Sequence, residues 1–235
     1  MRAGYDEHPL NPVPPVVWLL ALPLIASEAV FALGQMGFIG GGQGAGAVLR
    51  QLWVERTAFA PEFLARIWTR GTVDGQIHRL ITYPFVHYSV THALFVGVFL
   101  LALGNMVARA IRPVGVAVIF FGASVAGALV YTILAGLLPT VRFGPLVGGY
   151  PGVYGLLGGF TFLLWTRLGQ EQANRLRAFA LIGMLLVFQL VFGLLFGNAG
   201  YAWVAEITGF AAGFGLSFLL VPGGWRRVRA QIRHR

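Results

Sequence analysis

The chain has 235 residues, of which 57% are apolar and only 11% are charged, less than half the charged fraction of a typical soluble domain. The apolar residues form long uncharged blocks instead of amphipathic stripes. This composition excludes a soluble enzyme, a disordered chain and a disulfide scaffold. Because the chain has no cysteine, it also has no thiolate nucleophile and no cysteine-ligated metal.

The formal net charge of +9 comes from arginine alone, and five of the 17 arginines lie in the last ten residues. A short basic segment after an apolar span is typical of the positive-inside rule and of binding to anionic lipid headgroups. We therefore expect residues 222–235 to form a basic cytoplasmic tail that contacts membrane lipids. No groove of interleaved aromatic and basic residues accompanies it, so no nucleic-acid partner is expected.

The sequence predicts an all-α, polytopic membrane protein, because six stretches are long and apolar enough to cross a bilayer. They cover residues 16–37, 85–108, 113–137, 149–166, 178–197 and 201–221. Residues 1–15 are then an N-terminal segment, and residues 16–221 form a membrane domain of six helices. An even number of spans places both termini on one side, and a count of eleven arginines against six assigns that side to the cytoplasm.

The cellular membrane is predicted from composition. The absence of lysine is typical of a GC-rich bacterial genome, so we expect a multi-pass protein of the bacterial inner membrane. The N-terminal segment lacks the basic start and the small-residue cleavage site of a signal peptide, so the first span should be retained.

Residues 38–84 form the one long connection between predicted spans, on the outer side. Apolar residues recur in it at helical spacing: Leu49, Leu52 and Trp53, then Phe63, Leu64, Ile67 and Trp68. Short helices lying in the membrane interface would bury these faces. The alternative is a small extramembrane cap that packs on itself.

Four ionisable residues lie within the predicted spans: Glu28, His87, His92 and Glu206. A charged side chain left alone in hydrocarbon costs about 2.5–3.5 kcal/mol, so each must be neutral, paired or hydrated. On one helix, His87 and His92 would point about 140° apart and could not face one partner. Their spacing is not that of a zinc motif, so we expect no metal and no cofactor. The simpler alternative is that each histidine bonds a backbone carbonyl or a neighbouring helix.

Glycines line the fourth span, and Gly209 and Gly213 form a GxxxG pattern in the sixth. Small residues at this spacing let helix backbones approach closely, so the fourth and sixth spans should be in tight contact. This contact would bring Glu206 near Tyr150 and Pro151, with Glu206 protonated or hydrogen-bonded to a helix neighbour. Pro151 would also leave one backbone carbonyl free at the head of the fourth span.

Three segments resemble those of rhomboid intramembrane serine proteases, over roughly residues 70–220. Residues 75–92 (GQIHRLITYPFVHYSVTH) resemble the entry to that family's second span, residues 148–155 (GGYPGVYG) its glycine-rich nucleophile motif, and residues 206–210 (EITGF) its base motif. His87 and His92 match the family pattern. Where the family usually has Trp-Arg, this chain has His78-Arg79. The family's oxyanion asparagine lies four residues after the second histidine, and that position is Val96 here.

The resemblance implies that the catalytic residues have been lost. Depending on the register, Tyr150 or Pro151 stands at the nucleophile position, and no serine occurs between Val125 and Leu216. Glu206 stands at the base position, where the family has histidine. Losing the serine or its base costs about 10⁶ in rate, and the residual activity needs an intact oxyanion hole. We therefore expect a catalytically inactive, rhomboid-like pseudoprotease.

The expected function is binding of the transmembrane segments of other integral membrane proteins, as a chaperone, an adaptor or a complex subunit. The predicted client-binding cavity is formed by His87, His92, Tyr150, Pro151, Gly152 and Glu206. One alternative is a divergent protease or hydrolase with Tyr150 as nucleophile and Glu206 as base. Another is proton-linked transport through Glu28 and Glu206.

Overall fold

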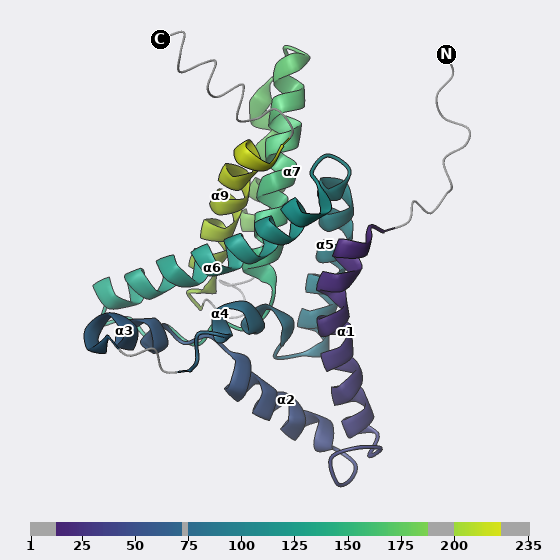
Figure 1. Ribbon diagram of the computed structural model, residues 1–235, viewed down its shortest axis with the longest axis vertical. Coiled ribbons are helices and arrows are strands. Elements are labelled where there is room, and N and C mark those ends of the chain that lie inside the picture. The colour runs from purple at the N-terminus through teal and green to yellow at the C-terminus, as the bar shows by residue number, and fades with distance from the viewer. Residues whose placement is uncertain (1–12, 72–74, 188–199, 222–235) are drawn as a thin grey trace.

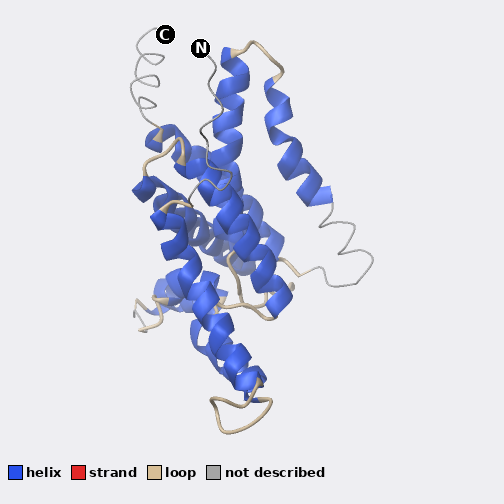
Figure 2. Cartoon of the chain, turned by 90° about the vertical axis from the view of Figure 1, so that its right-hand side faces the viewer, coloured by secondary structure: helices blue, strands red, loops and turns tan. Residues whose placement is uncertain are grey.

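The computed structural model describes residues 13–71, 75–187 and 200–221, and helices dominate this part of the chain (Figure 2). The predicted all-α fold is therefore confirmed. Most of the N-terminal segment and the whole of the predicted basic tail lie outside the described residues.

The helices follow one another with few long connections. In chain order they are α1 (Pro15–Gln35), α2 (Ala45–Thr57), α3 (Pro61–Arg70), α4 (Arg79–Thr82), the 3₁₀ turn η1 (Tyr83–Phe85), α5 (Val90–Ala108), α6 (Pro113–Leu137), α7 (Tyr150–Gln170), the 3₁₀ turn η2 (Arg175–Phe179) and α9 (Ala202–Leu220). Residues 180–187, between η2 and α9, are helical as well.

Local sequence signals set several helix ends. Pro15, Pro61 and Pro113 each occupy the first position of a helix, where the missing N–H costs no hydrogen bond. Ser89 caps α5 by accepting a bond from the backbone N–H of His92. Gly71 ends α3 in a left-handed conformation, which glycine adopts without strain.

Five of the predicted spans coincide with long helices. Most of their ends agree to within two residues, but α5 begins later than predicted, at Val90, and α7 continues further, to Gln170. Among the described residues, four helices are long and apolar enough to cross a membrane: α1, α5, α6 and α9. The predicted fifth span, 178–197, is helical over 180–187, and its remaining residues lie outside the described part of the chain.

α7 is long, but it is not among these four helices, because its sequence is rich in glycine. It packs against α5, α6 and α9, and eleven of its residues are buried, among them five consecutive ones from Gly155 to Gly159. A helix enclosed by other helices contacts protein more than lipid, so small residues that allow close approach replace bulky apolar ones. α7 is therefore the central helix of the bundle.

The contact between α7 and α9 is the most extensive in the structure, and the two helices run side by side in Figure 1. A Cβ atom added to Gly213 would overlap the carbonyl oxygen of Gly155, and one added to Gly209 would overlap that of Pro151. On the other helix, a Cβ at Gly158 would overlap the carbonyl oxygen of Phe210. The predicted close contact between the fourth and sixth spans is therefore confirmed.

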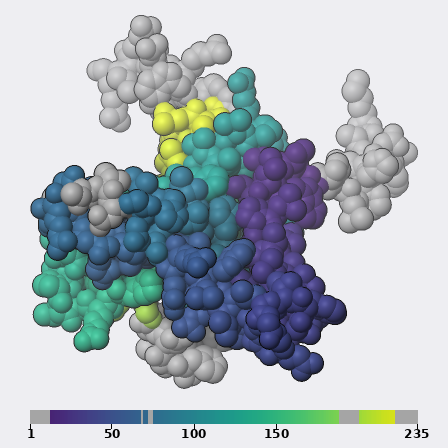
Figure 3. All heavy atoms as spheres, turned by 60° about the horizontal axis from the view of Figure 1, so that its bottom comes forward, coloured from purple at the N-terminus to yellow at the C-terminus, as the bar shows by residue number. Residues whose placement is uncertain are grey.

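One end of the bundle gathers the start of α1, the end of α5, the start of α6 and the ends of α7 and α9 (Figure 1). The start of α1 and the end of α9 thus lie at the same end of the bundle. The opposite end carries α2, α3 and α4, and α2 and α3 spread over the face seen in Figure 3.

The long first connection forms the predicted short helices, α2 and α3. Phe59, between them, exchanges two backbone hydrogen bonds of 3.0 and 2.7 Å with Leu146, in the connection before α7. Arg79 donates to the carbonyls of Glu55 and Ala58 at 2.7 and 2.9 Å, and its guanidinium lies over the ring of Phe63. These contacts fix the connection to the bundle.

The two helices differ in what they bury. Leu64 of α3 packs with Tyr131 of α6 in a buried cluster, so α3 docks on the bundle as part of a cap. On α2, in contrast, Val48, Leu52 and Trp53 remain exposed, as expected of a helix that lies in a membrane interface. α3 thus matches the alternative of a packed cap, and the interfacial position of α2 stays a prediction.

The close contact of α7 and α9 predicts that alanine destabilises the protein at Gly213 and not at Gly215, two positions of α9. Gly213→Ala should destabilise the protein by about 1–3 kcal/mol, since the new methyl group meets a backbone carbonyl that has no room to move. Gly215→Ala is the matched control, because a Cβ there meets nothing within 4 Å. Thermal unfolding of the two variants in detergent measures the difference, and equal midpoints would contradict the contact.

Candidate functional site

His87 lies before α5, which begins at Val90, and not inside the second span as predicted. The expected angle of 140° between His87 and His92 was therefore wrong, because the two residues do not share a helix. Their rings meet edge to face with centroids 4.8 Å apart. The chain bends at Ser89, which caps α5, and this bend brings both imidazoles to one place.

A glycine pair from the connection before α7 closes over these rings. Gly148 has a φ of 97°, and a Cβ there would lie 2.6 Å from Cε1 of His92 and 3.1 Å from Cδ2 of His87. The backbone N–H of Gly149 donates to Nε2 of His87 at 3.2 Å. This bond assigns the proton of neutral His87 to Nδ1. Only glycine fits at position 148, both sterically and conformationally.

Tyr150 begins α7 and stacks on His92, with ring centroids 5.0 Å apart and an interplanar angle of 19°. Val96, one turn further along α5, lies 2.8 Å from the position that a Cβ on Gly149 would take. Glu206 of α9 is 6% exposed and interacts electrostatically with the hydroxyl groups of Tyr150 and Tyr154. Gly209, three residues after Glu206, packs against the carbonyl of Pro151, so the close contact of α7 and α9 brings Glu206 to the region of Tyr150 as predicted.

Pro151 and Gly152 take less part in this arrangement. Pro151 lies in the first turn of α7, where its missing N–H removes no helical hydrogen bond, so the predicted free carbonyl does not arise in this way. Its own carbonyl contacts Gly209. A Cβ on Gly152 would meet the ring of Phe120 and, at 2.8 Å, Oγ of Ser124, so Gly152 faces α6 and not the histidines.

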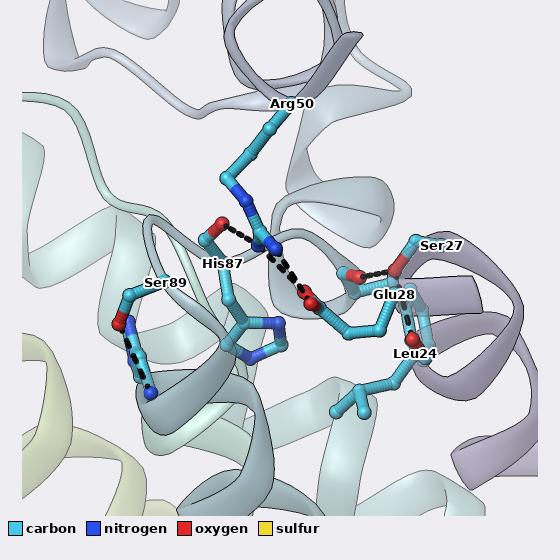
Figure 4. A network of polar contacts seen from close by, with 8 residues as sticks. Leu24, Ser27, Glu28, Arg50, His87 and Ser89 are labelled. Carbon is cyan, nitrogen blue, oxygen red and sulfur yellow. Dashed lines mark hydrogen bonds and ion pairs between the residues drawn. The ribbon is translucent and has the colours of Figure 1, made fainter. Parts of the chain in front are cut away.

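An ion pair joins α1 and α2 to the histidine segment (Figure 4). Arg50 of α2 donates to both carboxylate oxygens of Glu28 of α1, at 2.7 and 2.6 Å, and also to the backbone carbonyl of His87 at 2.8 Å. Its guanidinium lies 4.6 Å from the ring centre of Phe31. The side chains of Arg50 and Glu28 are only 14% and 16% exposed. Glu28 is thus paired, one of the three states allowed from the sequence.

The serine hydroxyls near α7 bond to their own helices. Ser124 of α6 donates to the carbonyl of Phe120 at 2.8 Å, and Ser217 of α9 donates to that of Gly213 at 2.8 Å. Both serines are fully buried. Within the described residues, neither serine is hydrogen-bonded to a histidine or a carboxylate, the arrangement that activates a serine nucleophile.

A family model for the rhomboid domain matches residues 74–223, more than half of the chain. The chain belongs to the rhomboid family. Its match agrees with the resemblance over residues 70–220 that the sequence motifs indicated. None of the curated proteins compared with the chain matches it significantly.

The rhomboid match includes the two histidines, the glycine pair, Tyr150 and Glu206, but it begins after Glu28 and Arg50. Part of the polar network around the rhomboid site therefore comes from α1 and α2. Among the described residues, no group of three histidines or carboxylates is placed to hold a metal ion.

Two residues at the site were not anticipated from the sequence. Arg50 was counted as an outer-loop arginine, although a glutamate in an apolar span requires a partner and Arg50 is the first arginine after that span. Ser124 was not singled out, although it is the one serine in the third predicted span. Its contact with Gly152 depends on how α6 packs against α7, which no local pattern encodes.

The ion pair predicts a strong effect of removing either partner. Arg50→Gln should destabilise the protein by roughly 3 kcal/mol, because it leaves the Glu28 carboxylate largely buried without its cation. Arg56→Gln, on the exposed side of α2, is the matched control and should have little effect. In a thermal-unfolding cycle, the double variant Glu28→Gln/Arg50→Gln should lose less than the sum of the single losses. Strictly additive losses of unfolding free energy would show that Glu28 and Arg50 do not stabilise each other.

His87 predicts a defined pH dependence of stability. It lies outside the spanning helices, and burial, followed by the charges of His92 and Arg50, lowers its pKa to about 3. A histidine in the unfolded chain has a pKa of about 6.5, so stability is fully present above that pH and is lost as pH falls toward the folded value.

Unfolding midpoints between about pH 8 and pH 4 should therefore fall less steeply for His87→Gln than for the parent chain. His78→Gln, at an exposed position of the same segment, should keep the parental slope. A parental slope in His87→Gln would exclude His87 as the titrating group.

Proposed function

We propose that this rhomboid-family protein binds the transmembrane segments of other integral membrane proteins and does not cleave them. The observation that carries this proposal is Tyr150, which stands at the family's nucleophile position in the ungapped register and stacks on His92 at an interplanar angle of 19°. The lone pair of an imidazole nitrogen lies in the plane of its ring. A partner stacked on the face of the ring is therefore not placed to give up a proton to it.

The site offers polar groups to a client helix. Nδ1 of His87 and Nε2 of His92 are buried and have no hydrogen-bond partner in the described part of the chain. A client segment with a polar residue could satisfy such groups at about 0.6 kcal/mol per interhelical hydrogen bond. Binding of this strength suits a chaperone, an adaptor or a subunit held in a larger complex.

The resemblance to the protease family implies that a client enters sideways, near the second and fifth spans. α5, the second span, exposes apolar side chains over its length, including Leu94 at 62%. We place the protein in the bacterial inner membrane with both termini in the cytoplasm, as the arginine distribution favours. The client would then approach α5 from within the bilayer.

A divergent hydrolase is the second candidate, because Glu206, Tyr150 and His92 lie close together. Its nucleophile would be the Tyr150 hydroxyl and its base the Glu206 carboxylate. The valine at the oxyanion position favours binding over this chemistry, because its side chain offers no hydrogen-bond donor to a developing oxyanion.

Site-specific photocrosslinking in native membranes tests the binding function. A photoreactive residue at Leu94, near the outer end of α5, should capture specific membrane proteins. The matched control is Ile133, a 45% exposed residue near the outer end of α6, which should capture far fewer. Equal capture at both positions would contradict a binding face on α5.

Activity assays on the purified chain separate the two candidates. We expect no labelling by a serine-directed fluorophosphonate and no cleavage of transmembrane peptides. Cleavage that stops on Tyr150→Phe or Glu206→Gln would establish the hydrolase and overturn the binding proposal.

A further inference from the structure

A groove of about 340 Å³ opens between α5 and α7, at the end of the bundle where both helices finish. It lies at the opposite end of α5 from the histidines. Its lining residues are Met106, Arg109, Phe160, Leu163, Leu164 and Arg167. The groove is therefore lined mainly by apolar side chains, together with two arginines.

The order of these residues along α7 gives the groove a direction. Phe160, Leu163 and Leu164 lie toward the middle of the helix, and Arg167 lies in its last turn. The seven helical steps from Phe160 to Arg167 span about 10 Å. Arg109 caps the end of α5 at the same level. The groove thus runs from apolar side chains inside the bundle to two guanidinium groups at its end.

This end of the bundle is cationic. From the end of α5 to the start of α6, and from the last turn of α7 through η2, the described residues include five arginines and one glutamate: Arg109, Arg112, Arg167, Arg175 and Arg177 against Glu171. The positive-inside rule assigns such an end to the cytoplasmic leaflet, which carries anionic lipids.

Both groove arginines retain free donors. Arg167 donates its Nε–H to Glu171 at 2.9 Å, but the two side chains are 74% and 52% exposed, so the pair is weak and screened. A guanidinium has five N–H donors, so four remain on Arg167. The Arg109 side chain is exposed and makes no hydrogen bond within the part of the chain that the structure describes. A phosphate placed between the two would be held by charge and by hydrogen bonds.

We propose that this groove is a binding site for one anionic phospholipid of the inner leaflet. An acyl chain lies against Phe160, Leu163 and Leu164, and the phosphate lies between Arg109 and Arg167. Charge complementarity selects an anionic lipid over a zwitterionic one. The site is distinct from the lipid contact predicted for the basic tail, and it does not depend on the proposed client binding.

Native mass spectrometry of the full chain, purified in detergent and titrated with phosphatidylglycerol or phosphatidylcholine, tests this site. We expect phosphatidylglycerol to bind more tightly than phosphatidylcholine. Arg109→Gln/Arg167→Gln should weaken phosphatidylglycerol binding roughly 30-fold, since each arginine near a lipid surface contributes about 1 kcal/mol. Phosphatidylcholine binding should change little in the same variant.

A matched double variant controls for net charge. Arg112→Gln/Arg177→Gln removes two exposed arginines from the same end, but neither lines the groove. It should weaken phosphatidylglycerol binding less than about threefold. Because all four arginines are exposed, both variants should keep the parental unfolding midpoint.

Three outcomes would overturn the proposal. Equal losses in the two double variants would show a diffuse surface attraction. Equal affinity for the two lipids would show an apolar groove without headgroup selection. A dimer mass that disappears in Arg109→Gln/Arg167→Gln would show that a second copy of the chain occupies the groove.

Discussion

The close approach of the α7 and α9 backbones is the contact on which the site depends. Glycines at 158, 209 and 213 let a carbonyl of each helix fill the space where the other would carry a Cβ. In a bilayer, apolar side chains gain nothing by leaving lipid for one another, so packing of this kind supplies much of the association energy. The contact also sets the position of Tyr150 relative to Glu206. The glycines therefore serve both the fold and the arrangement of polar groups.

The polar groups of the bundle are accommodated in three ways. Glu28 is held by Arg50 in a bidentate pair, while His87 stays neutral and accepts a bond from the Gly149 backbone. Ser124 and Ser217 use the carbonyls of their own helices. A serine held in this way is a structural residue. These two serine hydroxyls are thus bonded to backbone carbonyls, which agrees with a binding role for the site.

Much of the fold was predictable from the sequence, because spans and close helix contacts follow from local patterns. The glycines of α7 and α9 predicted their contact, and the apolar periodicity after residue 48 predicted α2 and α3. The site was predictable only in part. His87 and His92 were assigned to one helix, since sequence alone did not show that Ser89 would cap α5 between them. Arg50 reaches Glu28 only because the glycine-rich segment 40–46 turns the chain back, and such long-range geometry has no local signal.

The ion pair between Glu28 and Arg50 lies outside the segment by which the family is recognised. A fragment cut to residues 74–223 would contain every motif of the rhomboid match. It would nevertheless lack α1 and α2, and with them the guanidinium that holds the carbonyl of His87. The boundary drawn by family similarity is therefore narrower than the unit that folds around the histidines.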